Sequence, residues 1–521
     1  MTPEGDPVPR AREAGRWLVG LAFLGLVAAG VVAAAVMLWR TVDLETMLRN
    51  GDAETPEMPV PTVRPDPPAT VAGEFRVALL DSPESAQFLP DSAAGHGVQA
   101  DRWRETADSL GASVSTVSDA GEIAELGPGT TVVVPVAPCL SFDVGMALFR
   151  HLEDGGNLVL EGPVAARDEA CEWRGWSVLR SLTGADAVHE VEPRDAGLYL
   201  TVPGGLPLSH GLPPGSRLEM WQDLQIALET SDPGAYWSDY ALGPTPVEGD
   251  GDAVTGALAR RTEAGGRMVW FGFLSSDAAR EMDERRLLRL HSNGLLWAAG
   301  RPLAGLSAWP DGREAALLVT EDVEAEPQNA RPLAAVLRRI GVPGTFFVVS
   351  GLVEGEDAAI AAEVASAGEV GTHTFDHQTL AGRSPDDQRV RLRRSRDATE
   401  AWSDREVRGL RPPEERFDSA TLAAWAEVGG RYVAAENQAR SAAPELFRTG
   451  GSESPMVLVP RVMKDDYNVL VNDGLSWDRG IEEMVAGFRK IRRLGGVALL
   501  NLHTQFVDIG RADALGATLD S

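Results

Sequence analysis

Short apolar runs alternate with helical stretches along most of this chain. Three of the runs, 75–80, 130–135 and 157–161, have the length and composition of buried strands, and residues 144–153 have the spacing of a helix that crosses between the last two. Strands that alternate with crossing helices build a parallel sheet. The pattern predicts a doubly wound α/β domain over residues 75–303.

A second series of strands and helices is predicted over residues 308–521. Strands are expected at 315–320, 341–349, 367–373 and 497–502, with helices between the first three. Polar side chains follow several of these strands, among them Glu321, Asp322 and His373. This order is typical of an α/β barrel, where the active site lies at the carboxyl ends of the strands.

A longer apolar stretch comes before both domains. Residues 17–39 carry no charge and have a tryptophan at each end, and at about 1.5 Å per residue they are long enough to span a bilayer. Arginines at positions 10, 12 and 16 predict a cytoplasmic N-terminus, so everything after residue 40 is expected outside the cytoplasmic membrane. A cleaved signal peptide is the alternative, but its apolar core is usually only ~7–15 residues long.

Residues 41–74 are predicted to form an extended linker. Six prolines interleaved with acidic residues and threonines leave no apolar face to bury. The chain is therefore expected to contain a cytoplasmic stub and single membrane span at 1–40, this linker, and globular domains at 75–303 and 308–521. A length of 521 residues with 44% hydrophobic residues is sufficient for two cores.

The charge of the chain narrows the classes of partner. Its 77 acidic and 48 basic residues give a formal net charge of −29. Binding of nucleic-acid phosphates requires clustered lysine and arginine. We therefore do not expect a nucleic acid as partner.

The C-terminal region has three of the eight histidines, and their positions suggest metal chemistry. His373 and His377 are four residues apart, so their imidazoles can converge on one ion. His503 follows the strand predicted at 497–502 and should also lie at a carboxyl end. These residues predict a metal centre of the zinc type.

The segments 152–160 and 265–273, with the Leu-rich helix that continues through Trp297, resemble the class I glutamine amidotransferase-like fold in its non-catalytic branches. The resemblance covers residues 75–303 and implies a binding or scaffolding module. An amidotransferase-like hydrolase centred on Cys139 is the alternative, but a nucleophilic cysteine there would need a tight glycine-flanked turn that residues 138–141 lack. We expect Cys139 and Cys171, which are the two cysteines of the chain, to form a disulfide in an oxidising compartment.

The second domain resembles the polysaccharide deacetylase family, also called NodB-homology domains. His373-Thr374-Phe375-Asp376-His377 matches the family's His-Ser/Thr-x-x-His motif, and Leu502-His503 matches its last motif. The motif with two carboxylates falls on Glu321-Asp322, and the arginine motif on Arg411-Pro412-Pro413. Glu414 and Glu415 stand where the family has an aromatic residue and a glycine, and the fourth motif falls on Arg461 with Asp465-Asp466.

The resemblance implies an irregular (β/α) barrel and a role for each matching residue. Asp322, His373 and His377 are the implied ligands of a divalent metal, with zinc expected and cobalt, nickel or iron as alternatives. Glu321 is the implied general base, Arg411 orients it, and His503 is the implied general acid. A shifted register, with Asp322 as base and Glu324 as ligand, is the alternative.

The expected function is a membrane-anchored, extracytoplasmic, metal-dependent deacetylase. Its expected substrate is an N-acetylated glycan such as peptidoglycan or an exopolysaccharide. Because the first and third motifs depart from the family pattern, a glycan-binding pseudoenzyme with the same fold is the alternative.

Overall fold

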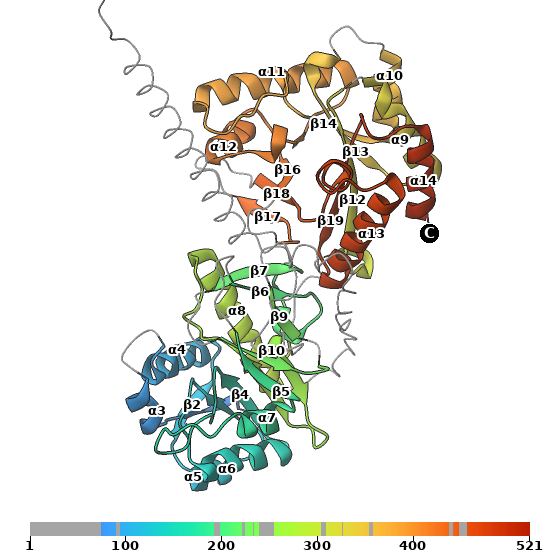
Figure 1. Ribbon diagram of the computed structural model, residues 1–521. Helices are drawn as coiled ribbons and strands as arrows, with labels where there is room; N and C mark the ends of the chain where they lie inside the picture. The colour runs from blue at the N-terminus through green and yellow to red at the C-terminus, as the bar shows by residue number, and fades with distance from the viewer. Residues whose placement is uncertain are drawn as a thin grey trace, which may run out of the picture. The chain divides into compact units, whose positions relative to one another are not determined.

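The structure is a computed structural model and describes residues 74–89, 94–191, 198–220, 225–232, 234–238, 255–303, 309–325, 327–353, 358–436, 441–447 and 456–520 (Figure 1). The membrane span expected at 17–39 and nearly all of the linker expected at 41–74 lie outside these ranges. Within them, we find no helix with both the length and the apolar character that a membrane crossing requires.

The first sheet is parallel at one end and antiparallel at the other. Its path runs β2-β1-β3-β4-β11-β10-β9-β6-β7, and β5 and β8 pair with each other beside it. The parallel strands are β1 (Arg76–Leu80), β2 (Ser113–Val117), β3 (Thr130–Val134), β4 (Asn157–Glu161) and β11 (Arg267–Phe271). The antiparallel strands are β5 (Ala187–Glu190), β6 (Leu198–Val202), β7 (Ser216–Met220), β8 (Ile226–Glu229), β9 (Gly234–Ser238) and β10 (Thr255–Arg261).

The expected parallel sheet is thus found over five strands and does not extend to the other six. The physical reason is the type of connection. β1, β2, β3 and β4 follow one another through helices, and η1 (Pro207–Ser209) lies in the longer connection from β6 to β7, whereas a short turn at residues 262–266 joins β10 to β11. Short connections of this kind pair strands antiparallel.

Helices cover both faces of the parallel strands. α4 (His96–Ser109) and α8 (Glu281–Ala298) contribute to one core, and α5 (Ala120–Ala124), α6 (Phe142–Glu153) and α7 (Ser177–Thr183) contribute to the other. Successive residues of a strand point to opposite faces, so Phe271 of β11 packs in the first core and Trp270 in the second. Short α3 (Pro83–Phe88) follows β1.

The second sheet has eight strands in the order β17-β18-β16-β15-β14-β13-β12-β19. Their bounds are β12 (Ala316–Val323), β13 (Gly344–Val348), β14 (Gly368–Thr372), β15 (Gly409–Leu410), β16 (Tyr432–Glu436), β17 (Glu445–Phe447), β18 (Met456–Arg461) and β19 (Val497–His503). All neighbours pair in parallel except β17 and β18. β18 also lies beside β19, although no ladder joins them within the described residues, so the sheet curls into an incompletely closed barrel.

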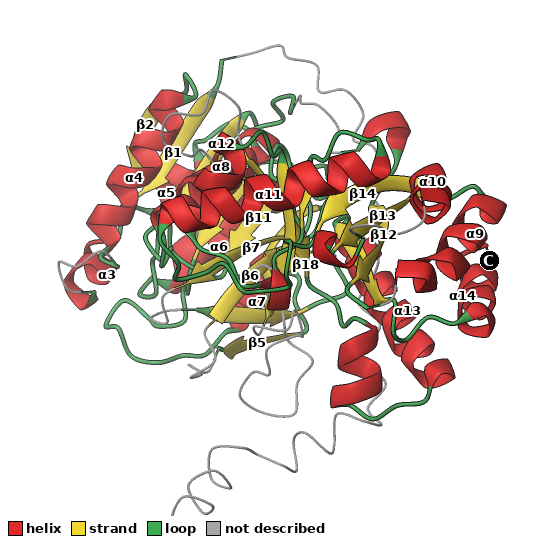
Figure 2. Cartoon of the chain, turned by 90° about the horizontal axis from the view of Figure 1, so that it is seen from above, coloured by secondary structure: helices red, strands yellow, loops and turns green. Residues whose placement is uncertain are grey.

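Helices connect the barrel strands on the outside. They are α9 (Arg331–Ile340), α10 (Ala358–Ala367), α11 (Pro385–Ser403), α12 (Ser419–Glu427), α13 (Trp477–Leu494) and α14 (Ile509–Asp520), and the short helices are η2 (Pro310–Gly312), η3 (Pro327–Ala330), η4 (Ser350–Leu352), η5 (Pro413–Glu415) and η6 (Asn468–Asn472). α14 and α10 both pack against α9 (Figures 1 and 2). Local sequence sets their ends, since Ser384 caps α11 before Pro385, and α13 ends at Gly495 with φ of 73°.

Candidate active site

Three side chains of metal-ligand type gather where β12 and β14 end. Glu324 follows β12, and His373 and His377 follow β14. The Glu324 Oε2 atom lies 3.4 Å from His373 Nε2 and 2.8 Å from His377 Nε2, and the two Nε2 atoms are 3.1 Å apart. In the described part of the chain, this is the one group of three such residues close enough to hold an ion. Two imidazoles and a carboxylate suit a zinc-like ion.

The surroundings prepare these residues for a metal. His373 Nδ1 lies 2.7 Å from the carbonyl oxygen of Arg411, which can only accept, so Nδ1 carries the proton and Nε2 is left for an ion. Burial by itself would raise the pKa of Glu324, but hydrogen bonds with both histidines outweigh burial and lower it. Thr374 and His377 have φ of 67° and 54°, a strained backbone that is common at functional sites.

Glu321, expected as the base, is not part of the Glu324, His373 and His377 group. Its side chain is 0% exposed, and neither carboxylate oxygen has a hydrogen-bond partner among the described residues. Burial raises the pKa of Glu321 well above its ordinary value, and the nearby carboxylates of Asp466 and Asp322 raise it further. Such a shift favours the neutral, protonated form of Glu321.

Asp322, expected as a metal ligand, lies beside Asn501 and Arg411. Its Oδ2 accepts a hydrogen bond from Asn501 Nδ2 at 2.9 Å, and its Oδ1 lies 3.6 Å from Nε of the buried Arg411. Burial favours the neutral acid, but the positive charges of Arg411 and His503 and the hydrogen bond from Asn501 oppose burial, and the pKa of Asp322 is lowered. The structure therefore brings Arg411 to Asp322, and Glu324 takes the place beside the two histidines.

His503 ends β19 with its ring fixed by Asp466. The ring Nδ1 lies 2.6 Å from Asp466 Oδ1, and the backbone N–H of His503 donates to Asp466 Oδ2 at 2.7 Å. Burial lowers the pKa of His503, but the hydrogen bond and charge of Asp466 outweigh burial and raise it to about 9. The Nε2 atom points toward Asp322 Oδ2 at 3.7 Å. A protonated imidazole thus faces the base.

The substituted third motif links two arginines. Glu415 Oε1 accepts from Arg411 Nη1 and from Arg461 Nε, both at 2.8 Å. Glu414 and Glu415 have φ of 54° and 53°. Arg461, placed by sequence in the fourth motif, therefore supports Arg411 through Glu415, whereas Asp466 of the same motif contacts His503.

Several residues of this site were not predicted from the sequence. Asn501 contacts Asp322, and Gln505 Nε2 donates to Glu324 Oε1 at 2.7 Å. The rings of Tyr467 and Phe506 lie 6.2 Å and 6.1 Å from that of His503. The alternation of Asn501 and His503 along β19 is a signal that could have identified Asn501, because residues two apart on a strand share a face.

The first sheet offers no thiol nucleophile in its described part. Cys139 is 0% exposed and is joined to Cys171 in a disulfide with the two Cα atoms 5.0 Å apart. No free cysteine is found among the described residues. The hydrolase centred on Cys139 therefore lacks its nucleophile.

Comparison with known proteins gives one family-model match, to a part of the chain that includes several strands of the second sheet. Residues 310–433 match the family model described as polysaccharide deacetylase. This match leaves the first domain uncovered, so its amidotransferase-like character stays a prediction. No curated protein is similar enough in sequence to give a match.

Solved structures of low similarity accompany this family match. A Mycobacterium smegmatis protein assigned to the polysaccharide deacetylases is 25% identical over 42% of this chain and 88% of its own, with a TM-score of 0.37. A family 4 carbohydrate esterase from Streptomyces lividans is 14% identical over 40% and 90%, with a TM-score of 0.28. The family 4 pseudoenzyme BA3943 from Bacillus anthracis is 18% identical over 40% and 60%, with a TM-score of 0.30. The similarity to polysaccharide deacetylases therefore rests on the family-model match over residues 310–433.

Proposed function

We propose that the C-terminal domain removes N-acetyl groups from a glycan with the help of a divalent metal ion. The observation that carries the proposal is the convergence, in a domain of this family, of the Glu324, His373 and His377 group with Asp322 and the His503–Asp466 pair. We assign the shifted register, with Glu324 as the third ligand and Asp322 as the general base.

The donor set fits a divalent ion of the zinc type. Two imidazole nitrogens and one carboxylate oxygen provide three ligands and leave coordination positions open. An ion bound there supplies a Lewis acid for the acetyl carbonyl and lowers the pKa of a water toward ~7. Zinc, cobalt, nickel and iron all accept these ligands.

The protein's own residues move the protons. Asp322 is ionised and is held by Asn501 and Arg411, so it accepts a proton from the attacking water. As the amide bond breaks, the departing nitrogen needs a proton. His503 donates it from Nε2 because Asp466 holds the imidazole in its protonated form. The aromatic rings of Tyr467 and Phe506 flank the sugar that carries this nitrogen.

We further propose that the domain works outside the cytoplasmic membrane, where peptidoglycan or an exopolysaccharide provides the acetylated sugar. Two features support this location. Residues 17–39 have the length and composition of a membrane anchor. The Cys139–Cys171 disulfide is typical of an oxidising compartment.

Three isosteric substitutions test the assignment of ligand and base. In Glu324→Gln the metal content of the purified protein should fall steeply, because a ligand is lost. Asp322→Asn should keep the metal while acetate release from an N-acetylglucosamine oligomer falls by roughly 10²–10⁴-fold. Glu321→Gln serves as the matched control and should keep both metal and activity, because Glu321 is fully buried and no described residue forms a hydrogen bond with its carboxylate.

Two results would contradict this assignment. If Glu321→Gln abolishes turnover and Asp322→Asn loses the metal, the register first implied by the sequence holds. If the wild-type protein holds stoichiometric metal but releases no acetate from acetylated glycans, the domain is a glycan-binding pseudoenzyme.

A further inference from the structure

The two histidines of the candidate metal site are held in different ways. His373 is 2% exposed, and its ring is fixed by the carbonyl oxygen of Arg411, which lies 2.7 Å from Nδ1. The side chain of His377 is 41% exposed, and among the described residues its Nδ1 has no hydrogen-bond partner. The second ring nitrogen of a metal-binding histidine usually has such a partner, which fixes the ring. The orientation of His377 therefore depends on the backbone that carries it.

This backbone is a short loop, residues 373–377, that begins where β14 ends. Thr374 and His377 lie in the left-handed region, with φ of 67° and 54°. Residues with a side chain seldom adopt this region, and they stay there only where the surrounding structure holds them. The contacts made by the loop therefore decide where the imidazole of His377 lies.

η4, which follows β13, holds the first half of the loop through its backbone. The N–H of Ser350 donates to the carbonyl oxygen of Thr374 at 3.0 Å, and the N–H of Gly351 donates to that of Phe375 at 2.8 Å. A Cβ atom on residue 351 would lie 2.5 Å from the Phe375 carbonyl oxygen, so this close approach requires glycine. Both bonds are made before Asp376 and His377 are reached.

α11 holds the second half of the loop through two arginines. The guanidinium of Arg394 lies over the ring of Phe375, with Cζ 3.4 Å from the ring centroid. Arg391 Nη1 donates to Asp376 Oδ2 at 3.0 Å. Residues three apart on a helix are neighbours on its surface, so the two arginines share one face of α11. They contact the two residues that directly precede His377.

α11 is a fixed support for these contacts. It packs against β14 and η4 (Figures 1 and 2). Ser395, next to Arg394, is 0% exposed, and its hydroxyl forms a hydrogen bond with that of Thr372, the last residue of β14. Ser395 Oγ also lies 3.2 Å from Ser350 Oγ. The helix, the strand end and η4 are thus joined beneath the loop.

We propose that Arg391 and Arg394 are positioning residues of the metal site. They hold the 373–377 loop so that His377 faces the ion, and they thereby set the affinity of the site for metal. In the described part of the chain neither arginine contacts a ligand side chain, so both act through Asp376 and Phe375. The inference rests on the proposed function for the presence of the ion, and it does not require acetate release.

The dissociation constant of zinc, measured by competition with a chromogenic chelator, tests the proposal on the full-length protein. The double variant Arg391→Ala, Arg394→Ala should raise this constant by about tenfold, the lower end of the range for groups that orient metal ligands. Arg394→Ala alone should raise it by about 2–5-fold, as expected for an exposed cation–π contact. Arg394→Lys should restore most of the affinity, because an ammonium can lie over the same ring.

Arg393→Ala is the matched control. Arg393 is exposed on the same turn of α11, and no contact joins it to the loop within the described residues. Its zinc dissociation constant should equal that of wild type. In the metal-free state, the double variant should shift the urea midpoint no more than Arg393→Ala does. The visible absorption of bound cobalt, which reports ligand geometry, should change in the double variant and not in the control.

Two results would overturn the inference. The first is a zinc dissociation constant that is the same in the double variant and in wild type. The second is a weaker affinity that comes with an equally lowered urea midpoint of the metal-free protein, because the arginines would then stabilise the fold and not the site. A protein that binds zinc more weakly in these variants, but releases no acetate as wild type, would contradict only the proposed function.

Discussion

Alternation along β12 divides the three acidic residues at the active site into two classes. Asp322 pairs in register with His503, whereas Glu321 pairs with the buried Leu502. Residues two apart on a strand share a face, so Asp322 and Glu324 belong on the polar side and Glu321 does not. The same parity can be seen in the sequence of β19, where Asn501 and His503 alternate with leucines.

The site could therefore be predicted in part from sequence. The motif at 373–377 and the strand-end position of His503 identified the histidines, and the structure brings them together with carboxylates. Choosing between the two registers required knowing which face of β12 meets the histidines. The family motif has two adjacent acidic residues, but this chain has three within four positions. Spacing alone cannot tell which of them is the general base and which is the metal ligand.

Asp466 sets the proton affinity of His503, and its replacement should move the pH dependence of the reaction. His503 must be protonated to act as the acid, so activity should fall as pH rises through the pKa of His503, which Asp466 raises to about 9. In Asp466→Asn the negative charge is lost while burial still lowers the pKa. The alkaline limb of the pH profile of kcat should therefore move to lower pH by more than about one unit.

Asp465→Asn is the control for this prediction. Asp465 lies 3.7 Å from Arg461 Nη1, and its Oδ1 accepts from the backbone N–H of Asn468. The alkaline limb should stay in place in this variant. An unchanged alkaline limb of the pH profile in Asp466→Asn would contradict the assignment of His503 as the general acid.

At the scale of elements, strands were predicted well where apolar runs are continuous. β3, β4 and β19 are buried along nearly their whole length, so each appears in the sequence as an uninterrupted apolar or β-branched run. The antiparallel strands gave no such signal. β7, with the sequence Ser-Arg-Leu-Glu-Met, buries polar residues among apolar ones, and its pairing depends on contacts with β6 that are set by tertiary structure.

The start of α12 illustrates how much one helix end depends on a single side chain. Asp418 Oδ1 accepts a hydrogen bond from the backbone N–H of Thr421 at 2.8 Å, and the backbone N–H of Asp418 donates to Thr421 Oγ1. Asp418 Oδ2 also accepts from the N–H of Gly382 at 2.8 Å. Asp418→Ala should lower the free energy of unfolding by about 1–2 kcal/mol, because the bonds that the carboxylate accepts from the N–H groups of Thr421 and Gly382 are lost. Urea denaturation followed by circular dichroism measures this change.

Asp404→Gly is a matched control at the other kind of helix end. Asp404 is the C-cap of α11 with φ of 54°, a conformation that glycine adopts without strain. The free energy of unfolding of the Asp404→Gly variant should stay within about 0.5 kcal/mol of the wild-type value. An equal decrease in the free energy of unfolding in the two variants would contradict a specific stabilising role for the Asp418 cap of α12.

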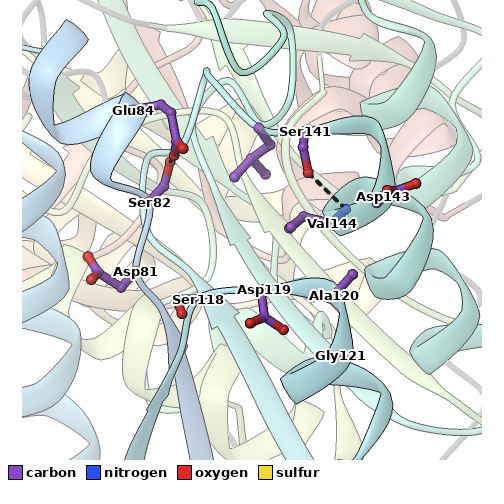
Figure 3. Close-up of a pocket in the computed structure, with 11 residues that line it drawn as sticks. Asp81, Ser82, Glu84, Ser118, Asp119, Ala120, Gly121, Ser141, Asp143 and Val144 are labelled. Atoms are coloured by element: carbon purple, nitrogen blue, oxygen red, sulfur yellow. Dashed lines mark hydrogen bonds between the residues drawn. The ribbon is translucent and has the colours of Figure 1, made fainter.

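At the scale of the whole molecule, the two sheets carry different chemistry. The second gathers histidines and ionised carboxylates at its strand ends, a set that suits hydrolysis. The first gathers carboxylates and hydroxyls around a pocket at the carboxyl ends of β1, β2 and β3 (Figure 3).

The disulfide between Cys139 and Cys171 should stabilise the first sheet without touching the second. It closes a loop with a sequence separation of 32 residues. In the chain-entropy model, a loop of this size contributes about 3–4 kcal/mol by restricting the unfolded chain. The Cys139→Ala, Cys171→Ala double variant should therefore unfold at lower denaturant concentration, and hydrogen exchange should speed up in β3 and β4. Exchange in β12 and the metal content should match wild type, since neither depends on this loop.

If a reducing agent leaves wild-type exchange in β3 unchanged, and an unreduced digest contains both cysteines as free thiols, the disulfide is absent from the native protein.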